Sequence, residues 1–488
     1  IMFDLSFSTI RSSTKNYVWL CTSIDDLPNK LEDRDLAIIN KEIKKNKSII
    51  LLNKGTHLEI IVIIEPHDKE EMRRVGADVA KIALDENLSE LAILSSEEAL
   101  EFLYEFVEGI LLNSYSFNQY KSFTKRENNI KYILQVPVKY EAYFMELYQL
   151  VKSVFWVRDM VNKAPSDLYS SIFVQEIINL FQDVSINIEV LEKKQIESMK
   201  MGGLLGVNRG SATPPYFLII HYNDELAQNA NPYVFIGKGI TFDTGGISLK
   251  PAKNMDEMKS DMAGGAVVAG LLYALSANHI PINAIGLIPI TDNMPGPNSL
   301  LPGDIITMMN GKTVEVINTD AEGRLILADA LCFAQKYDPS LVVSISTLTG
   351  AAHKALGHYV MAAMQSRATV LLKTLEKISI DTYERLVEFP LWDDYSDYIK
   401  SDIADIKNAG GDYAGAITAG KFLEFFSNFP FIHLDIGGPA YLTHHWGYWP
   451  KGGTGVGVRL LYNYLKTLLY LPELKDSLPQ KKNNKKNK

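Results

Sequence analysis

Apolar residues recur in short runs along the first 140 residues, with amphipathic stretches between them. Runs rich in β-branched and aromatic residues are typical of strands. Four such runs stand at 17–21, 48–52, 57–64 and 132–136. Apolar residues spaced three and four apart predict helices at about 70–85 and 97–113. We therefore expect residues 1–140 to form a small α/β domain that serves as a scaffold or in oligomerisation.

A helical pattern without a breaker follows from Glu141 to about Asn162 and ends before Ala164-Pro165, where a helix should stop. A long helix of this kind is a natural rigid connection between two α/β domains. We interpret residues 141–164 as this linker helix.

Apolar strands and helices alternate through residues 165–474, and one helix from about Met258 to Ala277 is apolar throughout. The strands expected here are 216–220, 234–237, 282–290 and 341–345. This alternation predicts an α/β fold whose larger domain has a mostly parallel sheet covered by helices on both faces. Functional residues in such sheets collect at the C-terminal ends of the strands.

Length and composition agree with two domains. A chain of 488 residues exceeds the roughly 250–300 residues that one core usually supports. The net charge is −9, although residues 475–488 hold six Lys and one Asp. We expect this basic tail to be disordered and the acidic remainder to disfavour broad nucleic-acid binding.

The chain has only two cysteines, Cys21 and Cys332, which argues against a disulfide framework and against a Cys-based zinc site. No secretory signal and no apolar stretch of 18 residues is visible in the sequence. These features predict a cytoplasmic protein that does not span a membrane.

The most unusual stretch is Asn-Thr-Asp-Ala-Glu-Gly-Arg-Leu at 318–325, between an apolar strand and an apolar helix. One acid at a helix start would stabilise it by about 1 kcal/mol. A cap does not explain Asp320, Glu322 and Arg324 together, whereas concentrated carboxylates at a strand end suit a divalent cation.

A second glycine-rich stretch, 237–251, also follows a strand and carries Lys238, Asp243 and Lys250. It lacks the Gly-x4-Gly-Lys-Ser/Thr pattern of a phosphate-binding loop, and Asp243 would repel phosphate. Asp261 follows at the start of the apolar helix. Four acids from three strand ends are what two cations with bridging carboxylates would need, and the nearby bases would suit an anionic transition state.

The 318–325 stretch resembles the signature of the leucine aminopeptidase (cytosol aminopeptidase) family of metallopeptidases. Further segments that carry the resemblance are 237–251, 259–264, 347–351, 401–405 and 433–440. The resemblance is strong over about 155–465 and weak in the N-terminal part.

Membership would imply two divalent metal ions per subunit, with Mn²⁺, Zn²⁺, Co²⁺ and Mg²⁺ left open. One metal would be held by Asp243, Asp320 and Glu322, and the other by Lys238, Asp243, Asp261 and Glu322. The metals would bind the free α-amine and scissile carbonyl of a peptide and activate a water as hydroxide.

The resemblance also implies two catalytic residues with basic side chains. Lys250 would donate to the oxyanion, and Arg324 would hold a bicarbonate ion that shuttles a proton. Substrates would be peptides with a free, Leu-like N-terminal residue, and the family's assembly would be a hexamer. The residues implied for the side-chain pocket are Met258, Thr347, Leu348, Gly350, Gly437 and Ala440.

Departures from the family pattern leave the side-chain preference open. Ser344 and Ser346 stand where Asp and Ala are more usual, and Gly420 and Gly437 stand where Ala is. None of the four is an implied metal ligand.

Other function classes find less support. The chain has no Gly-x-Ser-x-Gly elbow and no His-Glu-x-x-His zinc spacing. The alternative from another class is a DNA-binding regulatory protein on the same fold. Its basic patch would come from Lys121, Lys125, Arg126 and Lys131.

Overall fold

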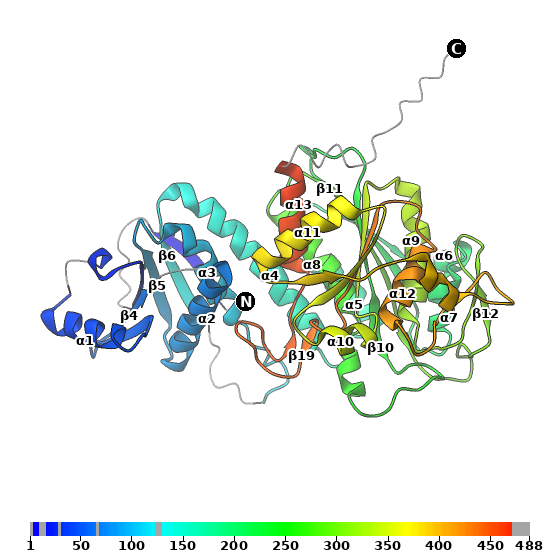
Figure 1. The fold of residues 1–488 in the computed structure, drawn as a ribbon, viewed down its shortest axis with the longest axis horizontal. Coiled ribbons are helices and arrows are strands. Elements are labelled where there is room, and N and C mark those ends of the chain that lie inside the picture. Colours follow the sequence, from blue (N-terminus) through cyan, green and yellow to red (C-terminus); the bar gives the residue numbers. More distant parts are fainter. Residues whose placement is uncertain (1–2, 9–15, 28–30, 65–67, 123–128, 471–488) are drawn as a thin grey trace, which may run out of the picture. The chain divides into compact units, whose positions relative to one another are not determined.

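The computed structural model describes residues 3–8, 16–27, 31–64, 68–122 and 129–470. The contacts divide the chain into two compact units (Figure 1). Unit 1 comprises Ile1–Lys152 and His444–Lys451, and unit 2 comprises Ser153–Thr443 and Gly452–Lys488. The predicted basic tail, 475–488, lies outside the described residues.

Unit 1 contains a six-stranded sheet with the order β1-β6-β5-β2-β4-β3. Among the described strands of this unit, only the edge pairing of β3 with β4 is antiparallel. The strands are β1 Phe3–Ser8, β2 Tyr17–Cys21, β3 Ile49–Asn53, β4 Leu58–Ile63, β5 Glu90–Ser95 and β6 Ile130–Gln135. The helices are α1 Asp33–Ile43, α2 Lys69–Asp85 and α3 Leu103–Asn113, with short 3-10 turns η1 Ile24–Asp26, η2 Leu100–Phe102 and η3 Val138–Tyr140. The α/β character predicted for this part is confirmed.

The predicted long helix is α4 Glu141–Asn162, and it is divided between the units after Lys152. Segment His444–Lys451 belongs to unit 1, where the phenol of Tyr448 donates to Glu70 at 2.9 Å. The boundaries 1–140, 141–164 and 165–474 therefore remain our proposal for how the chain is organised.

Unit 2 is built on a nine-stranded sheet with the order β16-β15-β18-β14-β9-β11-β8-β7, and β10 also pairs with β11. Its strands are β7 Asn187–Leu191, β8 Tyr216–Asn223, β9 Tyr233–Gly237, β10 Gly239–Asp243, β11 Asn283–Asn293, β14 Leu341–Ser346, β15 Met361–Ser366, β16 Leu386–Glu388 and β18 Phe431–Asp435. The pairs β7/β8, β8/β11 and β15/β18 are antiparallel and the others are parallel. The sheet is therefore mixed, with parallel strands at its centre.

Helices pack on both faces of this sheet, as predicted. On β11, Ile285 and Leu287 point into the core formed around α9 (Gly323–Ala334). The intervening Gly286 faces α8 (Ala263–Ala277), because a Cβ there would lie 2.6 Å from Leu272. Successive strand residues point to opposite faces, so α8 and α9 lie on opposite sides.

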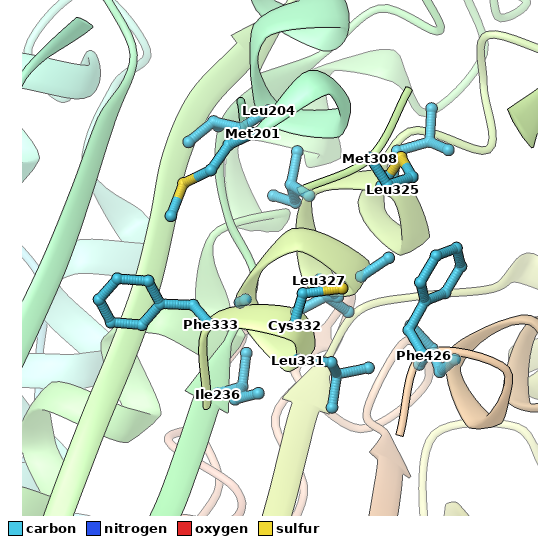
Figure 2. Packing of buried hydrophobic residues seen from close by; sticks show 14 of the residues in the cluster. Met201, Leu204, Ile236, Met308, Leu325, Leu327, Leu331, Cys332, Phe333 and Phe426 are labelled. Carbon is cyan, nitrogen blue, oxygen red and sulfur yellow. The ribbon is translucent and has the colours of Figure 1, made fainter. Parts of the chain in front are cut away.

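The core on the α9 side fixes where that helix begins. Figure 2 shows Leu331 and Phe333 of α9 among Ile236 of β9, Met201 and Phe426. All twelve residues of α9 are buried. A helix held by packing along its whole length gives a fixed position to the turn just before it, which carries Asp320 and Glu322.

The remaining elements surround this frame. The helices are α5 Ser170–Leu180, α6 Lys193–Ser198, α7 Gly202–Asn208, α10 Gly350–Leu356, α11 Thr369–Thr382, α12 Gly415–Glu424 and α13 Val458–Tyr470, and the 3-10 turns are η4 Met255–Ser260, η5 Gln335–Tyr337 and η6 Asp393–Ile399. There are also two small sheets. One is three-stranded and contains β12 Ile305–Thr307, β13 Thr313–Glu315 and β17 Ile406–Lys407, and the other pairs β19 Tyr441–Leu442 with β20 Gly452–Gly453.

One helical stretch among the described residues, Met255–Ala277, has the length and apolar composition of a membrane span. Its most apolar window is 94% buried inside the protein. A helix that is apolar all round is also what the centre of a large core requires, so this stretch is weak support for a span.

Candidate metal centre

The candidate residues lie where central strands of unit 2 end. Lys238 stands between β9 and β10, and its backbone N–H donates to Ile345 of β14 at 3.3 Å. Asp243 is the last residue of β10, and Asp320 and Glu322 lie in the turn before α9. Because these strands are parallel neighbours, their C-terminal ends meet at one edge of the sheet.

The structure brings three of the predicted acids into one cluster. Asp243, Asp320 and Glu322 each offer a carboxylate oxygen within 4.8 Å of the others. Lys250 bridges two of them, lying 2.7 Å from Asp243 and pairing also with Asp320. Carboxylates this close require a cation among them, and here an ammonium fills that role.

Asp261 joins the cluster through Lys238. The Nζ atom of Lys238 lies 2.9 Å from Asp261 Oδ2 and 2.7 Å from Glu322 Oε1. Because both oxygens contact the same nitrogen atom, the carboxylates of Asp261 and Glu322 are neighbours. The second oxygen of Asp261 accepts a hydrogen bond from the hydroxyl of Thr347 at 2.8 Å. The four predicted acids thus surround two ammonium groups, those of Lys238 and Lys250.

The donor set fits divalent cations. Asp261 Oδ2 and Asp320 Oδ1 are buried oxygens that accept no hydrogen bond within the described part of the chain, and each is met by a lysine ion pair. Oxygen-rich ligand sets suit hard cations such as Mg²⁺ and Mn²⁺, and mixed nitrogen and oxygen sets also accept Zn²⁺. The residues present could hold such ions among the carboxylates that the two ammonium groups now neutralise.

Electrostatics show how crowded the acids are. Burial raises the pKa of Asp243 to about 6, and Glu322 adds to the rise while Lys250 and Lys238 oppose it. Burial likewise raises the pKa of Asp261 and of Asp320. Burial would also raise the pKa of Glu322, but Lys238 and Lys250 lower it below its usual value. The cluster is thus short of positive charge.

Lys238 remains charged in this arrangement. Burial lowers its pKa, but the charges of Asp261, Glu322 and Asp243 outweigh burial and raise it overall. Its ammonium also donates to the Thr347 carbonyl at 3.2 Å. The charge of this lysine therefore depends on what other cations the acids face.

Asn293 and Thr319 hold the two acid-bearing turns together, and this role was not predicted from the sequence. Asn293 Nδ2 donates to Asp243 Oδ1 at 2.8 Å and to the Thr319 carbonyl at 3.0 Å. The Thr319 hydroxyl donates to the Gly245 carbonyl at 2.6 Å and accepts from the N–H of Ser248 at 2.8 Å. Gly245 has φ +87°, which a residue with a side chain rarely adopts.

Asn408 fixes the 318–325 turn and was also not predicted. Its carbonyl oxygen accepts from the N–H of Ile317 at 2.8 Å, and its amide donates to the Asn318 carbonyl at 2.7 Å. Arg324 Nη1 donates to the backbone carbonyl of Asn408 at 2.8 Å. The turn therefore depends on a residue more than 80 positions away.

Arg324 has one N–H group that could donate a hydrogen bond to a ligand. Its Nε–H is buried and has no hydrogen-bond partner among the described residues. Burial lowers the pKa of the guanidinium to about 10, so the group stays charged at neutral pH. A buried, charged donor without a partner fits a small anion such as bicarbonate.

The predicted pocket residues are held by different contacts. Asp435 accepts from the N–H groups of Leu348 at 3.2 Å and Gly437 at 3.0 Å, so these two lie together. Thr347 is tied instead to Asp261. A Cβ added to Gly350 would meet nothing within 4 Å.

Two of the predicted pocket residues are less directly connected. Met258 is half-buried on η4. Among the described residues, its contact with the site is a hydrogen bond that its backbone carbonyl accepts from the N–H of Asp261 at 3.3 Å. Ala440 is buried, with 3% of its surface exposed.

The two unusual serines lie beneath the site. Ser344 Oγ is 2.7 Å from Nδ1 of His433, its partner across β14 and β18. Burial lowers the pKa of His433 to about 3, and the charge of Arg324 adds to this effect. The imidazole is therefore neutral. Neither His433 Nε2 nor Ser346 Oγ has a hydrogen-bond partner among the described residues.

Comparison with known sequences identifies the family. Residues 155–462 match the catalytic domain of the cytosol aminopeptidase family, and residues 61–124 match its N-terminal domain. A probable cytosol aminopeptidase from Geobacter sulfurreducens is 39% identical over 408 residues, which cover 81% of this chain and 82% of that protein. One from Clostridium perfringens is 38% identical over 429 residues and 85% of each chain.

Solved structures agree with the sequence relatives. Cytosol aminopeptidase from Coxiella burnetii superposes with a TM-score of 0.81 at 27% identity, over 94% of this chain and 99% of that chain. The bottromycin maturation enzyme BotP in complex with Mn gives the same score and identity, over 93% of this chain and 98% of that chain. These matches confirm the resemblance seen in the sequence and the two-domain α/β fold. Because both family domains match and the relatives span most of its length, the chain belongs to the cytosol aminopeptidase family, a family of metal-dependent hydrolases.

Proposed function

We propose that this aminopeptidase uses two divalent cations, Mn²⁺ or Zn²⁺, to release N-terminal amino acids from peptides. The observation that carries the proposal is the convergence of four acids and two lysines at the strand ends of unit 2. One cation would be held by Asp243, Asp320 and Glu322. The other would be held by Lys238, Asp243, Asp261 and Glu322, so that Asp243 and Glu322 serve both.

When bound, the cations would supply a Lewis acid and a hydroxide nucleophile, and bicarbonate would supply a proton shuttle. Lys238 would take part as a neutral amine. A dication beside Asp261 and Glu322 would compensate the charges that now raise the pKa of Lys238, and burial would then favour the neutral form.

Lys250 would donate to the oxyanion that develops from the scissile carbonyl. Its ammonium already lies against Asp243 and Asp320 at the edge of the cluster, and its side chain is 20% exposed, so a substrate could reach it. Arg324 would hold bicarbonate through its unpartnered Nε–H. Asn408 would orient Arg324 for this role.

The substrate would be a peptide with a free N-terminus, because an amine can coordinate a cation and an internal amide nitrogen cannot. We propose a pocket for a Leu-like side chain formed by Met258, Thr347, Leu348, Gly350, Gly437 and Ala440. Such a pocket separates similar side chains by only about 1–3 kcal/mol per methylene.

We also propose that the protein acts in the cytoplasm as a homohexamer. The regulatory DNA-binding alternative is not favoured, because the family match and the site both indicate peptide hydrolysis. Two residues of its expected basic patch, Lys125 and Arg126, lie outside the described residues.

The proposal is tested with leucine-p-nitroanilide and its N-acetylated form. Protein stripped of metal should be inactive, and Mn²⁺ or Zn²⁺ should restore cleavage of the free-amine substrate only. Cleavage of both substrates at equal rates would contradict the exopeptidase assignment. Full activity after stripping would contradict the role of the cations.

A further inference from the structure

Unit 1 contains a cavity of about 750 Å³ that the proposed peptidase chemistry does not use. Its lining comes from α2, η2, α3, η3, α4 and Glu97 in the turn before η2, entirely within residues 69–144. A volume of this size is typical of sites for small molecules. The cavity therefore has room for a ligand of its own.

The charged groups around this cavity are predominantly acidic. Glu97, Glu101 and Glu105 line it, and Lys69 is the one base among its lining residues. Glu97, Glu101 and Lys69 are exposed, so they form the rim. The excess of carboxylates favours a ligand that carries positive charge.

Glu105 differs from the rim acids because it is buried, with only 8% of its surface exposed. Its one ion pair among the described residues is with exposed Lys69 at 3.9 Å, beyond hydrogen-bond distance. Burial raises the pKa of Glu105, and the backbone N–H of Glu105 and the charges of Arg73 and Lys69 offset this rise only in part. A cationic ligand in the cavity could therefore form a charge-assisted hydrogen bond with this carboxylate.

Aromatic rings form another part of the lining of this cavity. The rings of Tyr104 and Tyr143 lie 4.6 Å apart, and Phe144 packs edge-on against Tyr143 at 5.7 Å. Tyr140 completes the aromatic part of the lining. The faces of aromatic rings attract organic cations. They also pack against alkyl chains, which carboxylates do not.

We propose that this cavity binds a small organic diammonium ion, with one ammonium on Glu105, the alkyl chain against Tyr104 and Tyr143, and the second ammonium at the rim acids. Two positive charges match the excess of three carboxylates over one ammonium. An inorganic cation would not use the aromatic rings, and a neutral ligand would not compensate the negative charge of Glu105.

Isothermal titration calorimetry of the full-length, Mn²⁺-loaded protein with 1,4-diaminobutane tests the proposal. Wild type should bind the diamine saturably, and Glu105→Gln should weaken binding at least about tenfold through loss of a charge-assisted hydrogen bond. Tyr143→Leu, at a position 47% exposed, should weaken it about threefold without disturbing the fold.

Glu98→Gln is the matched control, because Glu98 is an exposed neighbour of Glu97 that does not line the cavity. It should bind the diamine as wild type does, and 1,4-butanediol should bind no variant. The proposal is overturned if wild type shows no saturable binding, if the diol binds equally well, or if Glu105→Gln matches Glu98→Gln.

Discussion

Replacing Gly323 with alanine should lower activity strongly while leaving the fold in place. Gly323 is the first residue of α9 and follows the acids of the 318–325 turn. A Cβ at this position would lie 2.6 Å from Nζ and 2.7 Å from Cε of Lys238. The new methyl group would therefore occupy space that the proposed ligand nitrogen now fills.

The substitution should change the stability of the protein much less than its activity. Alanine gains about 1 kcal/mol over glycine in a helix, and overpacking costs about 1–3 kcal/mol, so the net loss of stability should be small. Lys238 cannot move freely, because Asp261, Glu322 and the Thr347 carbonyl hold its ammonium. Ordinary contact begins at 3.4 Å. The required displacement is about 1 Å, a misplacement that can cost about 10²-fold in rate.

Thermal unfolding and kcat/KM with leucine-p-nitroanilide should be measured together for Gly323→Ala. Gly206→Ala is the control, since Gly206 lies in α7 and its added Cβ would meet its nearest neighbour at an ordinary 3.6 Å. The control should keep its activity and gain slightly in Tm. Wild-type kcat/KM in Gly323→Ala would refute the placement of Lys238 in the reacting centre.

Three further changes test neighbouring parts of the account. Lys250→Met should lower kcat by about 10²–10³-fold, as loss of an oxyanion donor does, while bound Mn²⁺ measured by elemental analysis stays unchanged. Asn408→Ala should lower stability by about 1–3 kcal/mol in urea unfolding and should lower kcat, because it removes the hydrogen bonds to the backbone of Ile317 and Asn318 that hold the 318–325 turn. His433 has a folded pKa of about 3 against 6.5 in the unfolded chain, so the unfolded state binds more protons between these values. Stability should therefore fall as pH drops below 6.5, by at most about 1.4 kcal/mol per pH unit, and His433→Gln should show a smaller fall.

The sequence predicted elements well where one pattern was unbroken. The helix expected from Glu141 to about Asn162 is α4, because no glycine or proline interrupts its periodicity. The helix expected over 97–113 begins as α3 only at Leu103, after the 3-10 turn η2. Strand β5, Glu90–Ser95, was missed because its short apolar run lies between two helical patterns.

The candidate acids could be found from sequence because they cluster in glycine-rich turns directly after strands. The residues that orient them could not. Asn293 lies 50 positions from Asp243, and Asn408 lies 90 positions from Asn318 in the acid-bearing turn. A single buried amide or carboxylate at such a distance leaves no local pattern, and only the folded sheet shows which turn it holds.

The number of Mn²⁺ ions bound per chain tests the central claim most directly. Elemental analysis of the loaded protein, with circular dichroism as the check on folding, should give two ions for wild type. Asp261→Asn should retain one, because Asp261 serves one cation, and Asp243→Asn should retain neither, because Asp243 serves both. One ion or none in fully active wild type, or two ions in Asp243→Asn, would contradict the shared two-cation site.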